Sequence, residues 1–151
     1  MTKILVAEDD FISRTLITSM LAPFGVCHAA ADGEEAVVAF RRAQAEGAPY
    51  DLVCLDIMMP RLDGHGVLKA IREAEWTKGV MPGNGAKVVM TTALSGGRHA
   101  LAAFREQCDG YLVKPLSRDA IVAVLAELGF AAGGDAANDD AVGRGGAEDA
   151  A

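Results

Sequence analysis

Side chains capable of acid–base or nucleophilic chemistry follow four of the short apolar runs in this chain. Glu8 and Asp9 come directly after the first run, Asp56 ends a later one, and Thr92 and Lys114 close two more. Converging carboxylates repel one another and favour a bound cation, and oxygen ligands without His or Cys favour a hard ion such as Mg²⁺. A carboxylate can attack phosphorus, and a lysine ammonium can neutralise a phosphoryl oxygen. These residue types indicate phosphoryl chemistry if the fold brings them together.

Asp56 stands out because it ends a continuous apolar run, Leu52 to Leu55. A run of this kind predicts a strand that is buried on both faces. An ionised carboxylate at its end needs hydrogen-bond partners, a cation or water. Asp56 is therefore either a capping side chain or the reactive group of a site.

The elements that must position these residues alternate along the chain. Short apolar runs predict strands at 3–7, 26–30, 51–56, 87–92 and 110–113. Between and after them, apolar residues at helical spacing predict helices at 12–24, 32–47, 62–76, 95–107 and 117–129. Such alternation predicts an α/β fold with a doubly wound parallel sheet covered on both faces, a three-layer α/β/α arrangement. In these sheets, sites form at the carboxyl ends of the strands, where the residues above are placed.

Composition limits the other functional classes. The chain has 151 residues and a formal net charge of −7, and it offers no clustered basic face for nucleic acid. No apolar run approaches the roughly 18 residues of a membrane span, and the N-terminus does not resemble a secretory signal. The three widely spaced cysteines fit neither a zinc site nor a disulfide framework. We therefore expect a cytoplasmic protein with no nucleic-acid or membrane partner.

Four segments carry a family resemblance. The segments "VAEDD", "DIMMPRLDG", "TTA" and "GYLVKP" resemble the signature segments of a bacterial response-regulator receiver domain of the CheY-like type. They occur in the family's order and spacing between Lys3 and Gly129, except for a longer loop before the fourth strand. The resemblance implies a flavodoxin-like (βα)5 fold with strand order 2-1-3-4-5. It also implies a receiver domain at 1–129. The acidic, Gly- and Ala-rich residues 130–151 have too few large apolar side chains to order themselves, so we expect a disordered tail there.

The resemblance assigns roles to the acidic residues. Asp56 is the expected phosphoacceptor. Glu8, Asp9 and Asp56 are expected to hold Mg²⁺ together with the backbone carbonyl of Met58.

The remaining site residues follow the same pattern. Lys114 is expected to contact the phosphoryl group, Thr92 to be the switch hydroxyl, and Tyr111 the switch aromatic. Thr91 could be confused with Thr92, but the hydroxyl next to the small Ala93 fits the family register. The family also implies a cis bond before Pro115.

The function implied is that of a single-domain response regulator in a two-component system or phosphorelay. A sensor histidine kinase or histidine phosphotransfer protein supplies the phosphoryl group, and an unknown downstream protein reads the changed surface of the fourth helix, fifth strand and fifth helix. The expected state is a monomer or a phosphorylation-dependent dimer. The protein is not expected to be an enzyme beyond catalysing its own phosphoryl transfer and dephosphorylation.

Three alternatives use related features. A haloacid-dehalogenase-type phosphatase needs an Asp-x-Asp motif after the first strand, where this chain has Glu8. A flavodoxin-like electron carrier needs a phosphate-binding loop there, and acids would repel the phosphate. A pseudo-receiver, an interaction module that is never phosphorylated, is the remaining alternative, and the complete acidic set with Lys114 argues against it.

Several residues have simpler roles. Asp10, Asp32 and Asp63 are expected to cap the helices that follow them. Gly64 and Gly66 are expected to relax the start of the third helix, and Trp76 to close its end. Two glycines at 96–97 predict that the fourth helix starts late or frays.

Overall fold

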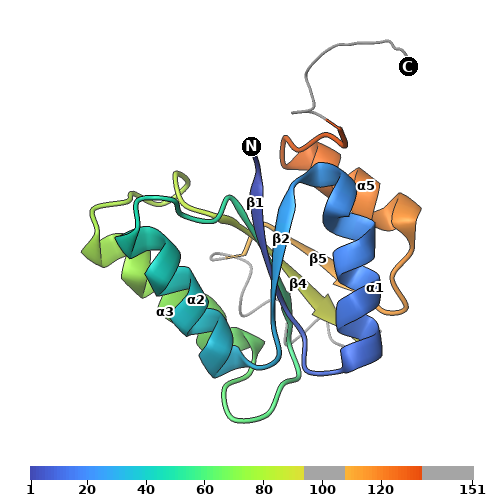
Figure 1. Ribbon diagram of the computed structural model, residues 1–151, viewed down its shortest axis with the longest axis horizontal. Helices are drawn as coiled ribbons and strands as arrows, with labels where there is room; N and C mark the ends of the chain where they lie inside the picture. The colour runs from blue at the N-terminus through green and yellow to red at the C-terminus, as the bar shows by residue number, and fades with distance from the viewer. Residues whose placement is uncertain (94–107, 134–151) are drawn as a thin grey trace.

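The computed structural model describes residues 1–93 and 108–133 (Figure 1). Five strands form one parallel sheet in the order β2-β1-β3-β4-β5. Their bounds are β1 Lys3–Ala7, β2 Val26–Ala30, β3 Leu52–Asp56, β4 Lys87–Thr92 and β5 Gly110–Val113. The predicted sheet and strand order are confirmed. β3 begins one residue later than predicted.

Four helices and one short 3-10 turn lie among the described residues. They are α1 Phe11–Leu21, η1 Ala22–Phe24, α2 Gly33–Ala45, α3 Gly64–Thr77 and α5 Arg118–Glu127. The first helix ends earlier than expected because Pro23 has no backbone N–H to continue the α-helical pattern. The helix predicted at 95–107 and the tail residues 134–151 lie outside the described residues, so the fraying of that helix and the disordered tail remain predictions.

Side-chain caps begin the described helices. The carboxylate of Asp10 accepts a hydrogen bond from Ser13 N, and that of Asp32 accepts one from Glu35 N. Asp63 accepts from Gly66 N in the same way. All three predicted caps are confirmed, and each satisfies a backbone donor that has no partner within its helix.

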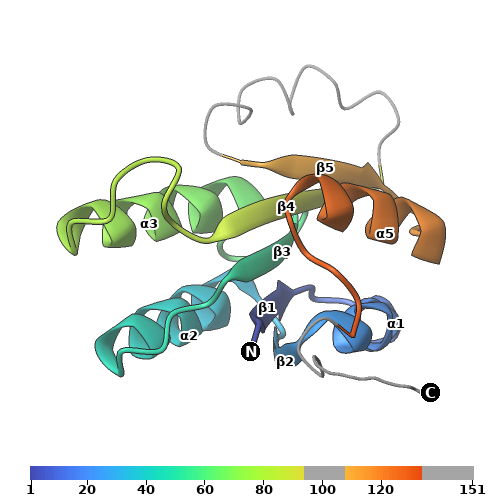
Figure 2. The same ribbon diagram turned by 90° about the horizontal axis from the view of Figure 1, so that it is seen from above.

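The sheet is the middle layer of the fold (Figure 2). Helices α2 and α3 cover one face and α1 and α5 cover the other. Because side chains alternate along a strand, Val53 and Leu55 of β3 pack with the α2–α3 layer, whereas Leu52 and Cys54 pack with α1 and α5. Every residue of β3 is buried, which explains its continuous apolar run.

The end of α3 differs from the prediction. The side chain of Trp76 is 67% exposed, so it does not close the helix. Instead, Gly79 takes a left-handed conformation with φ of 81°, and the N–H of Val80 donates to the carbonyl of Glu75. This backbone turn satisfies the last carbonyls and leads into the loop before β4.

No helix among the described residues is both long and apolar enough to cross a membrane.

Candidate functional site

Three carboxylates converge at the carboxyl edge of the sheet. One oxygen each from Glu8, Asp9 and Asp56 lies within 4.8 Å of the other two. Glu8 and Asp56 are buried, whereas Asp9 is exposed. The predicted convergence of the acidic residues is confirmed.

Strand register explains why these residues meet. In the parallel pairing of β1 with β3, Ala7 lies opposite Leu55. Glu8 and Asp56 are the next residues of the two strands, so parallel pairing places them side by side. The N–H of Glu8 donates to Ala30 O, which fixes the end of β1 against β2 as well.

Lys114 joins this cluster from the end of β5. Its Nζ donates a hydrogen bond to Glu8 Oε1 at 2.7 Å and lies 3.4 Å from Asp56 Oδ2. Its backbone N–H donates to Thr92 O, which ties the ends of β5 and β4 together. The Lys114–Pro115 bond is cis, as predicted.

Burial and charge act in opposite directions on the pKa values of Glu8 and Lys114. Burial raises the pKa of Glu8 above its ordinary value, and the hydrogen bond from Lys114 offsets only part of that rise. Burial alone would lower the pKa of Lys114, but its hydrogen bond to Glu8 and the nearby charge of Asp56 outweigh it and raise this pKa. Lys114 is therefore firmly protonated, while the buried Glu8 carboxylate benefits from added positive charge.

Backbone N–H groups hold the two buried carboxylates in place. The N–H of Asp10 donates to Glu8 Oε2 at 3.2 Å, and that of Met58 donates to Asp56 Oδ1 at 3.3 Å. The Met58 side chain is mostly exposed. The loop after β3 therefore meets Asp56 through its backbone.

Two threonines end β4, and their positions differ. Thr91 lies opposite Asp56 in the β3–β4 pairing, and its hydroxyl donates to Leu55 O at 3.5 Å. Thr92 is also buried and, by strand alternation, lies on the other face of the sheet. The hydroxyl of Thr91 is thus directed to the β3 backbone, and the role of Thr92 stays a prediction. Tyr111, on β5, is 38% exposed, and its switching role also stays a prediction.

Gly64 approaches the phosphoacceptor candidate more closely than the sequence indicated. A Cβ atom added there would lie 2.6 Å from Asp56 O and 2.8 Å from Ile57 Cα. At Gly66 the nearest atom would be Cδ1 of Leu62, the end of a flexible side chain. The relaxing role expected of both glycines stays a prediction, and at Gly64 the absence of a Cβ also permits close packing of α3 on the end of β3.

Arg61 was missed by sequence reasoning. It follows Asp56 by five residues, and its guanidinium Nη2 donates to Asp32 Oδ2 at 2.5 Å. The two residues are 29 positions apart, and no spacing or residue type in the sequence indicated their contact.

The donor set suits a hard divalent cation. The three converging ligand atoms are carboxylate oxygens, and Mg²⁺ prefers oxygen ligands of this kind. Cys54 lies on β3, two residues before Asp56, but burial raises the pKa of its thiol to about 12, so it stays a protonated core residue. The residues present thus fit Mg²⁺.

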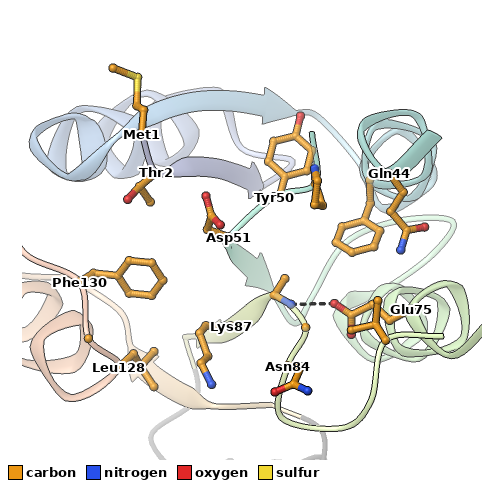
Figure 3. A pocket seen from close by; sticks show the side chains of 16 residues that line it. Met1, Thr2, Gln44, Tyr50, Asp51, Glu75, Asn84, Lys87, Leu128 and Phe130 are labelled. Carbon is orange, nitrogen blue, oxygen red and sulfur yellow. Dashed lines mark hydrogen bonds between the residues drawn. The ribbon is translucent and has the colours of Figure 1, made fainter. Parts of the chain in front are cut away.

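A hollow of about 550 Å³ lies at the opposite, amino edge of the sheet (Figure 3). Tyr50, Asp51, Lys87 and Phe130 surround it, and none of the predicted site residues does. Beside it, Glu75 accepts a hydrogen bond from Ala86 N, which anchors the loop before β4. Despite its size, this hollow therefore does not coincide with the candidate site.

Residues 4–126 match the family model described as "Response regulator receiver domain". "Probable transcriptional regulator ycf27" of Porphyridium aerugineum is 35% identical over 116 residues, which cover 76% of this chain and 42% of that protein. The chain thus spans less than half the length of this relative. "Two-component response regulator ORR41" of Oryza sativa is 31% identical over 133 residues, covering 87% of this chain and 97% of that protein.

Solved structures share the fold. A chain in the CheX–CheY–BeF3–Mg²⁺ complex from Borrelia burgdorferi has a TM-score of 0.70 and 26% identity, covering 84% of this chain and 88% of that chain. The receiver domain of the Francisella response regulator 1452 has a TM-score of 0.65 and 27% identity, covering 85% of this chain and 96% of that chain.

Proposed function

The chain belongs to the response regulator receiver domain family, and we propose that it accepts a phosphoryl group on Asp56 from a phosphohistidine donor. The observation that carries this proposal is the convergence of Glu8, Asp9, Asp56 and the Lys114 ammonium at one edge of the sheet. The donor is a sensor histidine kinase or a histidine phosphotransfer protein.

The chemical step is a displacement at phosphorus. A carboxylate oxygen of Asp56 forms the new O–P bond, the N–P bond of phosphohistidine breaks, and the histidine nitrogen keeps the bonding electron pair and takes up a proton. The product is an acyl phosphate on Asp56, which water later hydrolyses back to the carboxylate. The protein thereby catalyses only its own phosphoryl transfer and dephosphorylation.

The metal would be held by the carboxylates of Glu8, Asp9 and Asp56 and by the carbonyl of Met58. When bound, Mg²⁺ neutralises the negative charge of the carboxylates and of the incoming phosphoryl group. A similar structure that contains BeF3 and Mg²⁺ supports this assignment.

Lys114 and Thr92 are proposed to bind the new phosphoryl oxygens. Lys114 Nζ already lies 3.4 Å from Asp56 Oδ2, so it can move from Glu8 toward the added dianion with a short displacement. The Thr92 hydroxyl donates a hydrogen bond to the same group. Because the N–H of Lys114 donates to Thr92 O, movement of either residue is passed to both strand ends.

The output is a shift in a pre-existing equilibrium of the protein surface. Tyr111 turns inward as Thr92 moves, and the surface formed by the fourth helix, β5 and α5 changes its affinity for a protein partner. A phosphorylation-dependent dimer would use the same surface.

The start of α1 supplies an apolar surface for the donor. Phe11, Ile12 and Leu16 are 68%, 74% and 51% exposed, and Phe11 follows Asp9 by two residues. Exposed apolar side chains gathered beside a reactive site indicate a docking surface for another protein. We assign this surface to the protein that carries the phosphohistidine.

The chain is proposed to act as a single-domain regulator in the cytoplasm. The rice response regulator, matched over 97% of its length, supports the single-domain assignment. The three free cysteines suit a reducing compartment. A phosphorylation-independent interaction module is the alternative, and it has no use for the buried acidic pair with Lys114.

The test uses beryllofluoride, which mimics the phosphoryl group on a carboxylate. Purified protein with Mg²⁺ is titrated with beryllofluoride while backbone amide shifts are followed by NMR. We expect shifts at Thr92 and Tyr111 that require Mg²⁺ and disappear in Asp56→Asn. Asp119→Asn, which changes an exposed carboxylate on α5, is the matched control and should respond like the native protein.

Two results would count against the proposal. Shifts that persist in Asp56→Asn would place the reactive group elsewhere, and an unresponsive native protein would favour the interaction module. Turnover of a generic phosphomonoester by the native protein would instead indicate an enzyme.

A further inference from the structure

Arg61 holds an unusual backbone conformation in the loop between β3 and α3. Its φ is 65°, and among the residues that the structure describes it is the one non-glycine residue with positive φ. The left-handed region is unfavourable for a residue with a Cβ atom. Such a conformation persists where surrounding contacts hold it in place.

Those contacts come from the N-terminus of α2. Arg61 Nη2 donates to Asp32 Oδ2, and Arg61 Nε lies 3.6 Å from Glu34 Oε1. Asp32 uses its other oxygen to cap α2 through Glu35 N. The N–H of Glu35 and then Arg61 lower the pKa of Asp32, so this carboxylate stays ionised near neutral pH.

The backbone of the same loop lies directly against α2. A Cβ atom added at Gly33 would lie 2.0 Å from the carbonyl oxygen of Leu62. No side chain could fit between the two segments. The loop is therefore fixed on this side both by the Arg61 ion pair and by backbone contact.

At its other end the loop meets the acidic site. Met58 N donates to Asp56 Oδ1, three residues before Arg61. Gly64 N donates to Ile57 O, which closes the loop onto the end of β3. The position of the Met58 peptide group thus depends on how the rest of this short loop is held.

We propose that Arg61 is a positioning residue: its ion pair with Asp32 fixes the β3–α3 loop so that the Met58 N–H faces the Asp56 carboxylate and the Met58 carbonyl is held beside it. The inference rests on the proposed function, because it takes the carboxylates and the carbonyl of Met58 to hold Mg²⁺. It extends the site to the start of α2, which has no reactive residue of its own.

The experiment measures Mg²⁺ binding by calorimetry in the native protein, Arg61→Ala, Arg61→Lys and Arg41→Ala. We expect Arg61→Ala to weaken Mg²⁺ binding by about tenfold, the lower end of the effect of outer-shell partners. Arg61→Lys keeps one charged donor and should recover part of the loss. Arg41 is an exposed arginine on α2, and Arg41→Ala should leave binding unchanged.

Two further measurements separate positioning from simple stability. In the metal-free protein, the Met58 amide shift should change both in Arg61→Ala and in Asp32→Asn. The asparagine still offers an acceptor for Glu35 N, so the cap of α2 is kept. The double variant should bind Mg²⁺ no more weakly than either single variant, because both changes break one contact. Additive losses would show that the two residues act separately and would overturn the proposal.

These measurements distinguish failure of the positioning role of Arg61 from failure of the function proposed for Asp56. A lower thermal unfolding midpoint in Arg61→Ala, with Mg²⁺ affinity and the Met58 shift unchanged, would show a purely structural residue and overturn the positioning role. Native protein that binds neither Mg²⁺ nor beryllofluoride would overturn the function proposed for Asp56. The Met58 amide shift of the metal-free variants would still decide whether Arg61 positions the loop.

Discussion

The Lys114 ammonium donates to Glu8 Oε1 at 2.7 Å, although the two residues are 106 positions apart. The same ammonium lies 3.4 Å from Asp56 Oδ2. One cation from the last strand thus neutralises carboxylates that belong to the first and third strands. Lys114 thus supplies part of the positive charge that a bound metal ion would also bring to these carboxylates.

Replacing Lys114 should separate its contribution to stability from its competition with Mg²⁺. In Lys114→Met, Glu8 remains buried without a charged partner, and we expect a loss of roughly 2–3 kcal/mol in unfolding free energy without metal, less than for a fully buried pair. Mg²⁺ affinity should rise roughly tenfold, because the competing Lys114 ammonium is gone while the mutually repelling carboxylates remain. Urea unfolding in chelator and calorimetry would measure the two effects. Lys69→Met, an exposed lysine on α3, should change neither, and a weakened Mg²⁺ affinity in Lys114→Met would refute the competition.

Mg²⁺ should stabilise the folded protein. A ligand at ten times its dissociation constant adds about 1.4 kcal/mol to the unfolding free energy, which corresponds to roughly 4–6 °C for a domain of this size. Differential scanning fluorimetry with and without Mg²⁺ would measure the shift. Asp9→Asn should remove most of it, whereas Asp119→Asn should keep it. An equal shift with NaCl at matched ionic strength would argue against a specific site.

The two early glycines of α3 should respond differently to alanine. Gly64→Ala places a methyl group against the Asp56 carbonyl, and overpacking of this kind costs about 1–3 kcal/mol. Gly66→Ala meets only the movable end of Leu62, and alanine favours the helix by up to about 1 kcal/mol. Urea unfolding of both variants would give the comparison. Equal effects at the two positions would contradict the close approach at Gly64.

The apolar start of α1 should affect phosphoryl transfer without affecting the site itself. Ile12→Ser should slow transfer from the cognate phosphohistidine donor while leaving beryllofluoride binding unchanged, because Ile12 is 74% exposed beside the acidic edge. Val38→Ser, on α2, removes a similar side chain that is 55% exposed and serves as the control. Stopped-flow or radiolabel transfer assays would measure the rates. Unchanged transfer in Ile12→Ser would exclude this surface from docking.

Cys54 predicts a loss of stability at alkaline pH. Burial raises the pKa of its thiol from 9.0 to about 12, so the folded chain holds a proton that the unfolded chain loses. The stability from this group is complete below about pH 9 and falls as pH rises toward 12. Between pH 7 and pH 10.5 the native protein should lose about 2 kcal/mol more unfolding free energy than Cys54→Ala. Parallel losses in both proteins, measured by urea unfolding, would refute this account.

The sequence predicted the sheet well because each strand has its own local signal. A buried central strand reads as a continuous apolar run, and the polar residues after it mark its end, as at Asp56. Helix starts were equally local, since Asp10, Asp32 and Asp63 each bond a backbone N–H three residues later. Parallel pairing then places successive strand ends at one edge, which is why the acidic cluster could be anticipated.

The contacts that were missed depend on distant segments. The Arg61–Asp32 pair forms because the β3–α3 loop turns back on α2 with a positive φ at Arg61, and the residue types around Arg61 give no sign of that turn. The close approach of Gly64 to Asp56 depends on how α3 packs on β3, and the local helix propensity of glycine gives no sign of it. Trp76 looked suited to closing a helix, but Gly79 satisfied the helix end through its backbone.

The order of the strands along the chain also bears on how the protein is made. Glu8, Asp9 and Asp56 leave the ribosome well before Lys114, and within the described part of the chain β5 pairs with β4 alone, at the border of the sheet. A chain still in synthesis therefore carries these carboxylates before the Lys114 ammonium that pairs with Glu8 has been made. The acidic edge gains its ammonium only once β5 has been translated, so a product truncated before Lys114 lacks this charge.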